Sequence, residues 1–65
     1  MFKEYDCVIT RVQKEGYPAG TEGVIVGVYS AGPACEVELW DKDGYPVDVV
    51  TYLFSELQKW SDNSV

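Results

Sequence analysis

Residues 34–45, ACEVELWDKDGY, carry the clearest indication of the fold class of this chain. Apolar and polar side chains alternate along it, which is typical of a strand with one buried face. One face would carry Cys35, Val37 and Leu39, and the other Glu36, Glu38 and Trp40. After it, Asp41-Lys42-Asp43-Gly44 predicts a hairpin loop whose Asp43-Gly44 step supplies the left-handed position of a bulged turn. We therefore expect a half-buried strand that turns tightly into the next one.

On both sides of this stretch, glycine and proline separate similar runs rich in Val, Ile, Tyr and Thr. The expected strands cover residues 5–12, 23–29, 34–41, 45–51 and 59–60. In the second strand, Val24, Val26 and Val28 would share one face, with Ile25 and Tyr29 on the other. A long loop over residues 13–22 follows the first strand, and one helical turn around residues 55–57 precedes the last. Pro46 places the start of the fourth strand at a sheet edge. This order predicts an all-β, small five-stranded SH3-like barrel.

The chain has 65 residues, enough for a single domain over residues 1–65. We expect an ordered core from about residue 3 to residue 60, with residues 61–65 frayed. Apolar types make up 46% and charged types 25%, which argues against a disordered tail or a coiled coil. No apolar run is long enough to span a membrane, and no leader pattern is present. We therefore expect a cytoplasmic protein without a membrane partner.

The charge balance narrows the choice of partner. Eleven acidic residues against five basic ones give a formal net charge of −6, and there is no histidine. The basic residues stand singly among acidic ones: Lys3, Arg11, Lys14, Lys42 and Lys59. A nucleic-acid-binding protein normally presents a basic stripe, because neutralising phosphates supplies much of its affinity. We therefore expect no nucleic-acid partner and favour a basic protein.

The sequence contains no recognisable set of catalytic residues. There is no histidine to act as a base, and no serine or cysteine lies in a recognisable nucleophile turn. Glu36 and Glu38 would lie about 7 Å apart on one strand face, but a glycosidase built on such a pair needs a larger cleft. We therefore expect a protein that is not an enzyme and that uses no cofactor.

Metal binding and disulfide formation are disfavoured as well. Asp41 and Asp43 resemble the start of a calcium loop. That loop, however, needs an oxygen ligand where Tyr45 stands, a glycine where Pro46 stands and a bidentate Glu where Tyr52 stands. The hairpin turn explains the same residues. Two cysteines without histidine are too few for a zinc site. We interpret both, Cys7 and Cys35, as reduced apolar residues of the core.

The most informative feature is a set of acidic and aromatic residues that would share one surface. The set, here called the acidic stripe, comprises Glu36, Glu38, Trp40, Asp41, Asp43, Tyr45 and Asp48. Aromatic rings surrounded by carboxylates suit Arg and Lys side chains, through cation–π contacts and charge-assisted hydrogen bonds. The alternative is that Trp40 closes one end of the barrel and the acidic residues only solvate the surface. The stripe is the predicted protein-binding site.

A second aromatic set is open to two interpretations. Tyr17, Tyr52 and Trp60 could line a groove beside the long loop, where SH3 domains bind proline-rich peptides. Alternatively, Tyr17-Pro18 packs the loop onto the barrel, and this interpretation is preferred. Phe54 and Leu57 in the helical turn are expected to plug the barrel.

The scaffold resembles known families. Gly20-Thr21-Glu22-Gly23 followed by Val24-Ile25-Val26 resembles the second strand of SH3-like barrels, including the KOW segment of transcription and ribosomal proteins and small cyanobacterial photosynthetic subunits. Further segments make the chain similar to the bacterial family called domain of unknown function 4926. They cover residues 5–8, 34–39, 41–44, 50–51 and 55–57. This resemblance spans almost the whole chain and carries no catalytic residues. It implies an antitoxin or immunity role through neighbouring toxin-like genes.

Three functional hypotheses follow. The leading one is a non-enzymatic, acidic protein-binding module, an inhibitor of the antitoxin or immunity kind that covers the basic face of a partner. The second is a small structural or regulatory subunit of a larger complex. The third is a KOW-like nucleic-acid-binding module, which the negative charge disfavours.

Overall fold

The computed structural model describes residues 2–60, so the prediction that residues 61–65 are frayed lies outside the described part. Five strands form one antiparallel sheet in the order β4-β3-β2-β1-β5. The elements are β1 (Cys7–Thr10), β2 (Glu22–Val28), β3 (Ala34–Trp40), β4 (Pro46–Leu53), the 3₁₀ turn η1 (Phe54–Glu56) and β5 (Leu57–Lys59). The predicted all-β fold, a small SH3-like barrel with one helical turn before the last strand, is confirmed.

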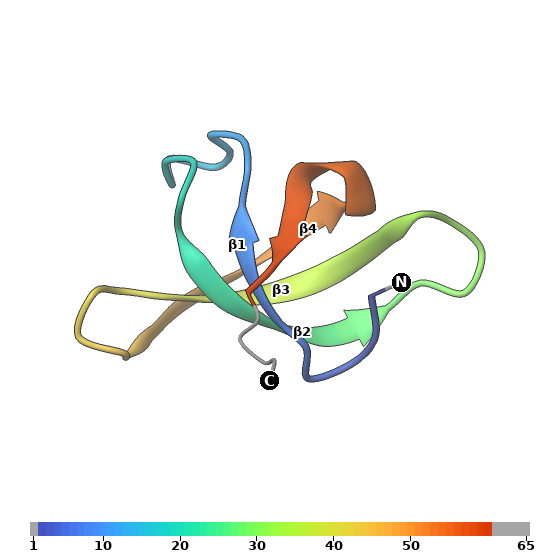
Figure 1. Ribbon diagram of the computed structural model, residues 1–65, viewed down its shortest axis with the longest axis horizontal. Coiled ribbons are helices and arrows are strands. Elements are labelled where there is room, and N and C mark those ends of the chain that lie inside the picture. The colour runs from blue at the N-terminus through green and yellow to red at the C-terminus, as the bar shows by residue number, and fades with distance from the viewer. Residues whose placement is uncertain (1, 61–65) are drawn as a thin grey trace.

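Three loops define the ends of the barrel. Figure 1 shows the β3–β4 hairpin (yellow) and the β2–β3 hairpin (light green) projecting at opposite sides of the view. The long loop between β1 and β2 (blue to cyan) rises between them at the top. Within residues 2–60, no helix has the length and apolar character needed to cross a membrane.

The core lies on the inner face of the curled sheet. Cys35, Val37 and Leu39 of β3 are fully buried, as the alternation predicted. The register brings Val50 opposite Val37 and Tyr52 opposite Cys35. The other apolar members of this core are Val8, Ile25 and Leu57. Burial of these side chains, at about 25 cal/mol per Å² of apolar surface, is the main force that holds the five strands together.

Strand boundaries differ from the prediction at both ends of the chain. β1 begins only at Cys7, because Tyr5 has a left-handed φ of 73° and the Asp6 amide closes a turn on the Lys3 carbonyl. At the other end, β4 continues to Leu53, where it pairs with Ala34. The last strand therefore covers Leu57–Lys59 rather than residues 59–60.

Cys7 and Tyr29 do not face the side of the sheet that the sequence predicts. Cys7 is exposed, because Val8 points into the core and its neighbour must point out. The interpretation of Cys7 as a core residue is therefore wrong, whereas Cys35 is buried as expected. A register shift between Ile25 and Gly27 interrupts the alternation of β2. Tyr29 consequently reaches the outer face while Ile25 is in the core, so these two do not share a face.

Candidate binding groove

The outer face of β3 carries the first part of the acidic stripe. Glu36 and Glu38 are both half-buried on this face, and their carboxylates already accept hydrogen bonds from the protein. The Trp40 indole Nε1–H donates to Glu38 Oε1 at 3.1 Å. Glu36 accepts hydrogen bonds from the hydroxyls of Tyr29 and Thr51. These two carboxylates therefore fix neighbouring side chains as well as charging the surface.

Asp48 does not lie on the same face as Glu36 and Glu38. A register shift between Leu39 and Trp40 adds Val47 to β4 as an extra residue, so Asp48 stands opposite Leu39 on the inner side. There its Oδ2 atom accepts a hydrogen bond of 3.0 Å from the Tyr17 hydroxyl. The prediction that Asp48 extends the stripe along the facing strand is therefore wrong, and Asp48 instead anchors the long loop.

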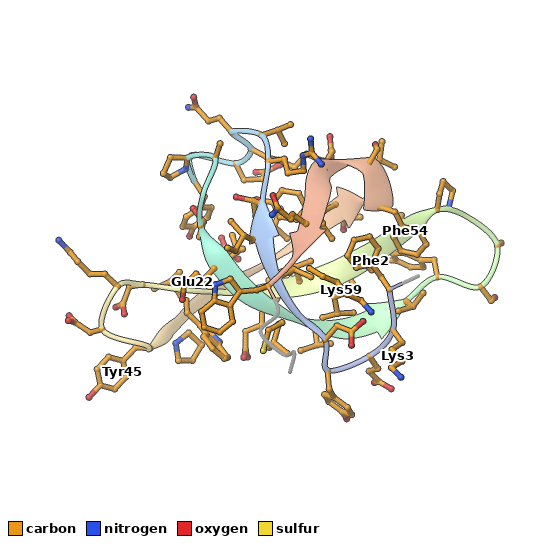
Figure 2. All side chains as sticks on the ribbon, in the orientation of Figure 1. Phe2, Lys3, Glu22, Tyr45, Phe54 and Lys59 are labelled. Carbon is orange, nitrogen blue, oxygen red and sulfur yellow. The ribbon has the colours of Figure 1, made fainter. Side chains whose placement is uncertain are left out.

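The β3–β4 hairpin holds the remaining stripe residues. Asp41 Oδ1 accepts the backbone amides of Asp43 and Tyr45, and Gly44 has the predicted left-handed conformation with φ 86°. The carboxylate of Asp41 thus builds the turn. Asp43 and Tyr45 are exposed, and in Figure 2 Tyr45 projects away from the body of the molecule. Among the described residues, no three His, Cys, Asp or Glu side chains gather closely enough to hold a metal ion.

The long loop is ordered by a tight turn at its tip. Lys14 and Tyr17 exchange backbone hydrogen bonds of 2.9 Å, and the two residues between them, Glu15 and Gly16, both have positive φ. This is the geometry of a type I′ turn. The turn places the Tyr17 side chain against the core and against Asp48. The expectation that Tyr17 packs the loop onto the barrel agrees with these contacts.

Thr10 ties the other half of the loop to β1. It is fully buried, its Oγ1 donates to the Pro18 carbonyl at 3.2 Å, and the same atom accepts the Thr21 amide at 3.1 Å. The Thr10 amide and carbonyl also pair with the backbone of Thr21 and Gly20. Because one buried hydroxyl satisfies two loop groups, Pro18 and Thr21 are held at fixed positions beside β2.

A groove opens between the long loop and the β3–β4 hairpin, with a volume of ≈ 660 Å³. Tyr17 and Trp40 supply aromatic surface, and Glu22 and Asp41 supply carboxylates. Its other lining residues are Pro18, Gly20, Thr21, Lys42 and Val47. In Figure 2, Glu22 lies near the base of the hairpin. The groove therefore joins two members of the acidic stripe, Trp40 and Asp41, to residues of the loop.

This groove differs from the aromatic set predicted beside the long loop. Tyr52 is fully buried in the core and cannot line a surface, so that part of the prediction is wrong. Trp60 is half exposed but is not among the lining residues. Of the three aromatics proposed, only Tyr17 lines the groove. Phe54 packs on Phe2 with ring centroids 5.4 Å apart, and Leu57 is buried, so both cover the barrel as expected.

Local carboxylates raise the pKa of the phenols that contact them. The hydrogen bond to Asp48 raises the pKa of Tyr17, and the hydrogen bond to Glu36 does the same for Tyr29. Burial raises the pKa of the Cys35 thiol, which keeps it protonated. At neutral pH the two phenols therefore stay protonated and act as hydrogen-bond donors.

A separate ion pair covers the outer edge of β4. Lys14 Nζ lies 2.7 Å from Glu56 Oε1, donates to the Thr51 carbonyl, and stands 5.0 Å from the centre of the Tyr52 ring. Glu56 also accepts the Leu53 amide, and its pKa is lowered chiefly by its hydrogen bond with Lys14. The pair therefore occupies backbone groups of an edge strand that would otherwise be open to another chain.

Thr10, Glu22 and Val47 belong to this region although the sequence does not indicate it. Thr10 lies at a strand end outside any motif, and the motif that contains Glu22 indicates only the barrel, so the course of the loop is what reveals their role. Comparison of the chain with protein-family models, curated proteins and solved structures finds no match. The resemblance to domain of unknown function 4926 stays a prediction.

Proposed function

We propose that this chain is a non-enzymatic, acidic protein-binding module that recognises a basic partner protein in the cytoplasm. We further propose that it inhibits that partner in the manner of an antitoxin or immunity protein, by covering a basic functional face. A standard interface of about 800 Å² per partner is roughly one fifth of the 4223 Å² surface of this chain. One face of so small a protein is therefore enough for a specific complex.

The observation that carries the proposal is the groove between the long loop and the hairpin. It combines the aromatic surface of Tyr17 and Trp40 with the carboxylates of Glu22 and Asp41. Aromatic residues supply many of the energetically important contacts in protein interfaces, while complementary charge orients and accelerates the encounter. With a net charge of −6, the chain attracts basic proteins while they diffuse towards it, before any contact forms.

The test is capture of partners from native cells by the immobilised chain, followed by activity assays. The expected result is one basic protein bound in equal molar ratio, released by salt, and inhibited when the purified chain is added. A multi-subunit assembly that survives salt would contradict the inhibitor proposal and favour a structural subunit. If no protein is captured, the proposal of a stable basic partner is rejected.

Charge reversal on the exposed rim gives a matched comparison. Glu22→Lys changes an exposed groove residue, and Glu4→Lys makes the same charge change at an exposed site outside the groove lining. Both positions are preferable to Glu36 and Glu38, whose carboxylates accept internal hydrogen bonds. The proposal predicts that Glu22→Lys slows association with the captured protein much more than Glu4→Lys does. Equal effects would mean that only total charge matters.

A further inference from the structure

Both aromatic residues of the groove donate their polar hydrogen to a carboxylate. Trp40 Nε1–H donates to Glu38 at 3.1 Å, and the Tyr17 hydroxyl donates to Asp48 at 3.0 Å. A negative acceptor at the edge of a ring pushes electron density into the ring, because hydrogen-bonded groups polarise one another. The ring faces therefore attract a cation more strongly than free Tyr or Trp would. This pairing holds the two rings in place before any ligand arrives.

The rest of the groove matches a cation carried on an apolar stem. Pro18 and Val47 add apolar lining, while Glu22 and Asp41 add carboxylates. Arginine suits this combination better than lysine. Its guanidinium is planar and weakly hydrated, stacks on aromatic rings, and pairs with a carboxylate through two hydrogen bonds.

We propose that the groove receives one arginine side chain from an extended segment of the basic partner, with the guanidinium stacked on Trp40 and paired with Glu22. This inference rests on the proposed protein-binding function and names the chemistry that the module recognises. Among the described residues that line the groove, Lys42 is the only cation. Because Lys42 carries the same charge as the incoming arginine, we expect it to compete for the carboxylates of the lining.

The experiment is a titration of the ¹⁵N-labelled full chain with blocked Gly-Arg-Gly, Gly-citrulline-Gly and Gly-Lys-Gly peptides, followed by NMR. Citrulline keeps the planar shape of arginine without its charge. We expect saturable shifts of the Trp40 indole N–H and the Glu22 amide with the arginine peptide, with a dissociation constant in the millimolar range. The citrulline peptide is expected to bind about tenfold more weakly, and the lysine peptide a few-fold more weakly.

Matched variants separate the groove from the rest of the surface. Trp40→Leu is expected to weaken binding about tenfold, whereas Trp60→Leu, at a half-exposed indole outside the lining, is expected to leave it unchanged. Glu22→Gln is expected to weaken it several-fold and Glu4→Gln to have no effect. Because Glu22 is exposed, this pair tests the proposal even if Trp40→Leu fails to fold. Lys42→Gln is expected to strengthen binding.

Three results would overturn the inference. One is equal binding of the citrulline or lysine peptide. Another is a shift of the Trp60 indole signal while that of Trp40 stays fixed. The third is a partner, captured from cells, that binds the Trp40→Leu and Glu22→Gln variants as tightly as the natural chain. In this third case the protein-binding function stands and the groove is rejected as its site, so the two proposals fail separately.

Discussion

Gly23 offers the sharpest test of the fold that positions the groove. It pairs with Leu39 across the β2–β3 ladder, next to Glu22 and Trp40 of the groove lining. A Cβ atom added at Gly23 would stand 2.6 Å from the Glu38 carbonyl oxygen and 2.8 Å from Val37 Cγ1. Neither neighbour can move easily, because one is backbone in a central strand and the other is a fully buried side chain. The Gly23→Ala variant must therefore strain the sheet.

Overpacking of a well-packed interior lowers the free energy of unfolding by about 1–3 kcal/mol. Because the added Cβ atom meets backbone, we expect Gly23→Ala to lie near the upper end, at roughly 2–3 kcal/mol. In a domain of this size each kcal/mol lowers Tm by about 4–8 °C. We therefore expect Gly23→Ala to unfold roughly 10–20 °C below the natural chain in thermal unfolding followed by circular dichroism.

Gly27→Ala is the matched control, since nothing lies within 4 Å of its added Cβ atom and its φ is not left-handed. Its unfolding free energy is expected to stay within about 1 kcal/mol of the natural value, or to rise slightly. If Gly23→Ala melts together with Gly27→Ala, the register between β2 and β3 is not the one described. A register slip of one residue would move every side chain to the other face of the sheet, and the groove would be lost with it.

Three further substitutions test individual contacts. Thr10→Val removes the hydroxyl that serves both the Pro18 carbonyl and the Thr21 amide, so urea unfolding should show a loss of about 1–3 kcal/mol; an unchanged midpoint would show that the loop does not depend on Thr10. Glu56→Gln tests the pH dependence of stability, because Lys14 lowers the pKa of Glu56 from its ordinary 4.5. The Glu56 carboxylate therefore stabilises the fold above pH 4.5, and this contribution disappears as pH falls through the lowered pKa. The gap in unfolding free energy between the natural chain and Glu56→Gln should be constant near neutral pH and shrink below pH 4.5, and a gap that persists in acid would contradict the ion pair. Tyr52→Phe should leave stability unchanged or raise it slightly, since the buried Tyr52 hydroxyl has no hydrogen-bond partner among the described residues; a loss above about 1 kcal/mol would mean that this hydroxyl is bonded.

The strand pattern could be predicted because burial imposes a period of two on a sheet. The alternation around Val37 was sufficient to place three core residues, and Gly44 was sufficient to place the turn. Boundaries were less predictable, since Tyr5 has a left-handed φ that no local residue type requires. The sequence also places Cys7 in the core, whereas its neighbour Val8 occupies that position, because two adjacent apolar residues leave the buried face undecided.

The composition of the groove could not be predicted, and bulges are the main reason. Without the register shift beside Leu39, Asp48 would stand opposite Glu38 and extend the stripe, as the sequence suggested. With the shift, Asp48 lies opposite Leu39, where it stays exposed and accepts the hydrogen bond from the Tyr17 hydroxyl. The long loop then brings Tyr17 beside the same groove that Trp40 lines, although the two residues are far apart in the sequence. No local sequence pattern indicates that Tyr17 and Trp40 line the same groove.

Acidic recognition at the groove can be tested by calorimetric titration of the captured basic partner with this chain, at low and at raised salt. We expect one-to-one binding whose affinity falls with salt, falls strongly with Glu22→Lys, and falls little with Glu4→Lys. Binding that ignores both salt and the charge at Glu22 would contradict an acidic recognition surface at the groove.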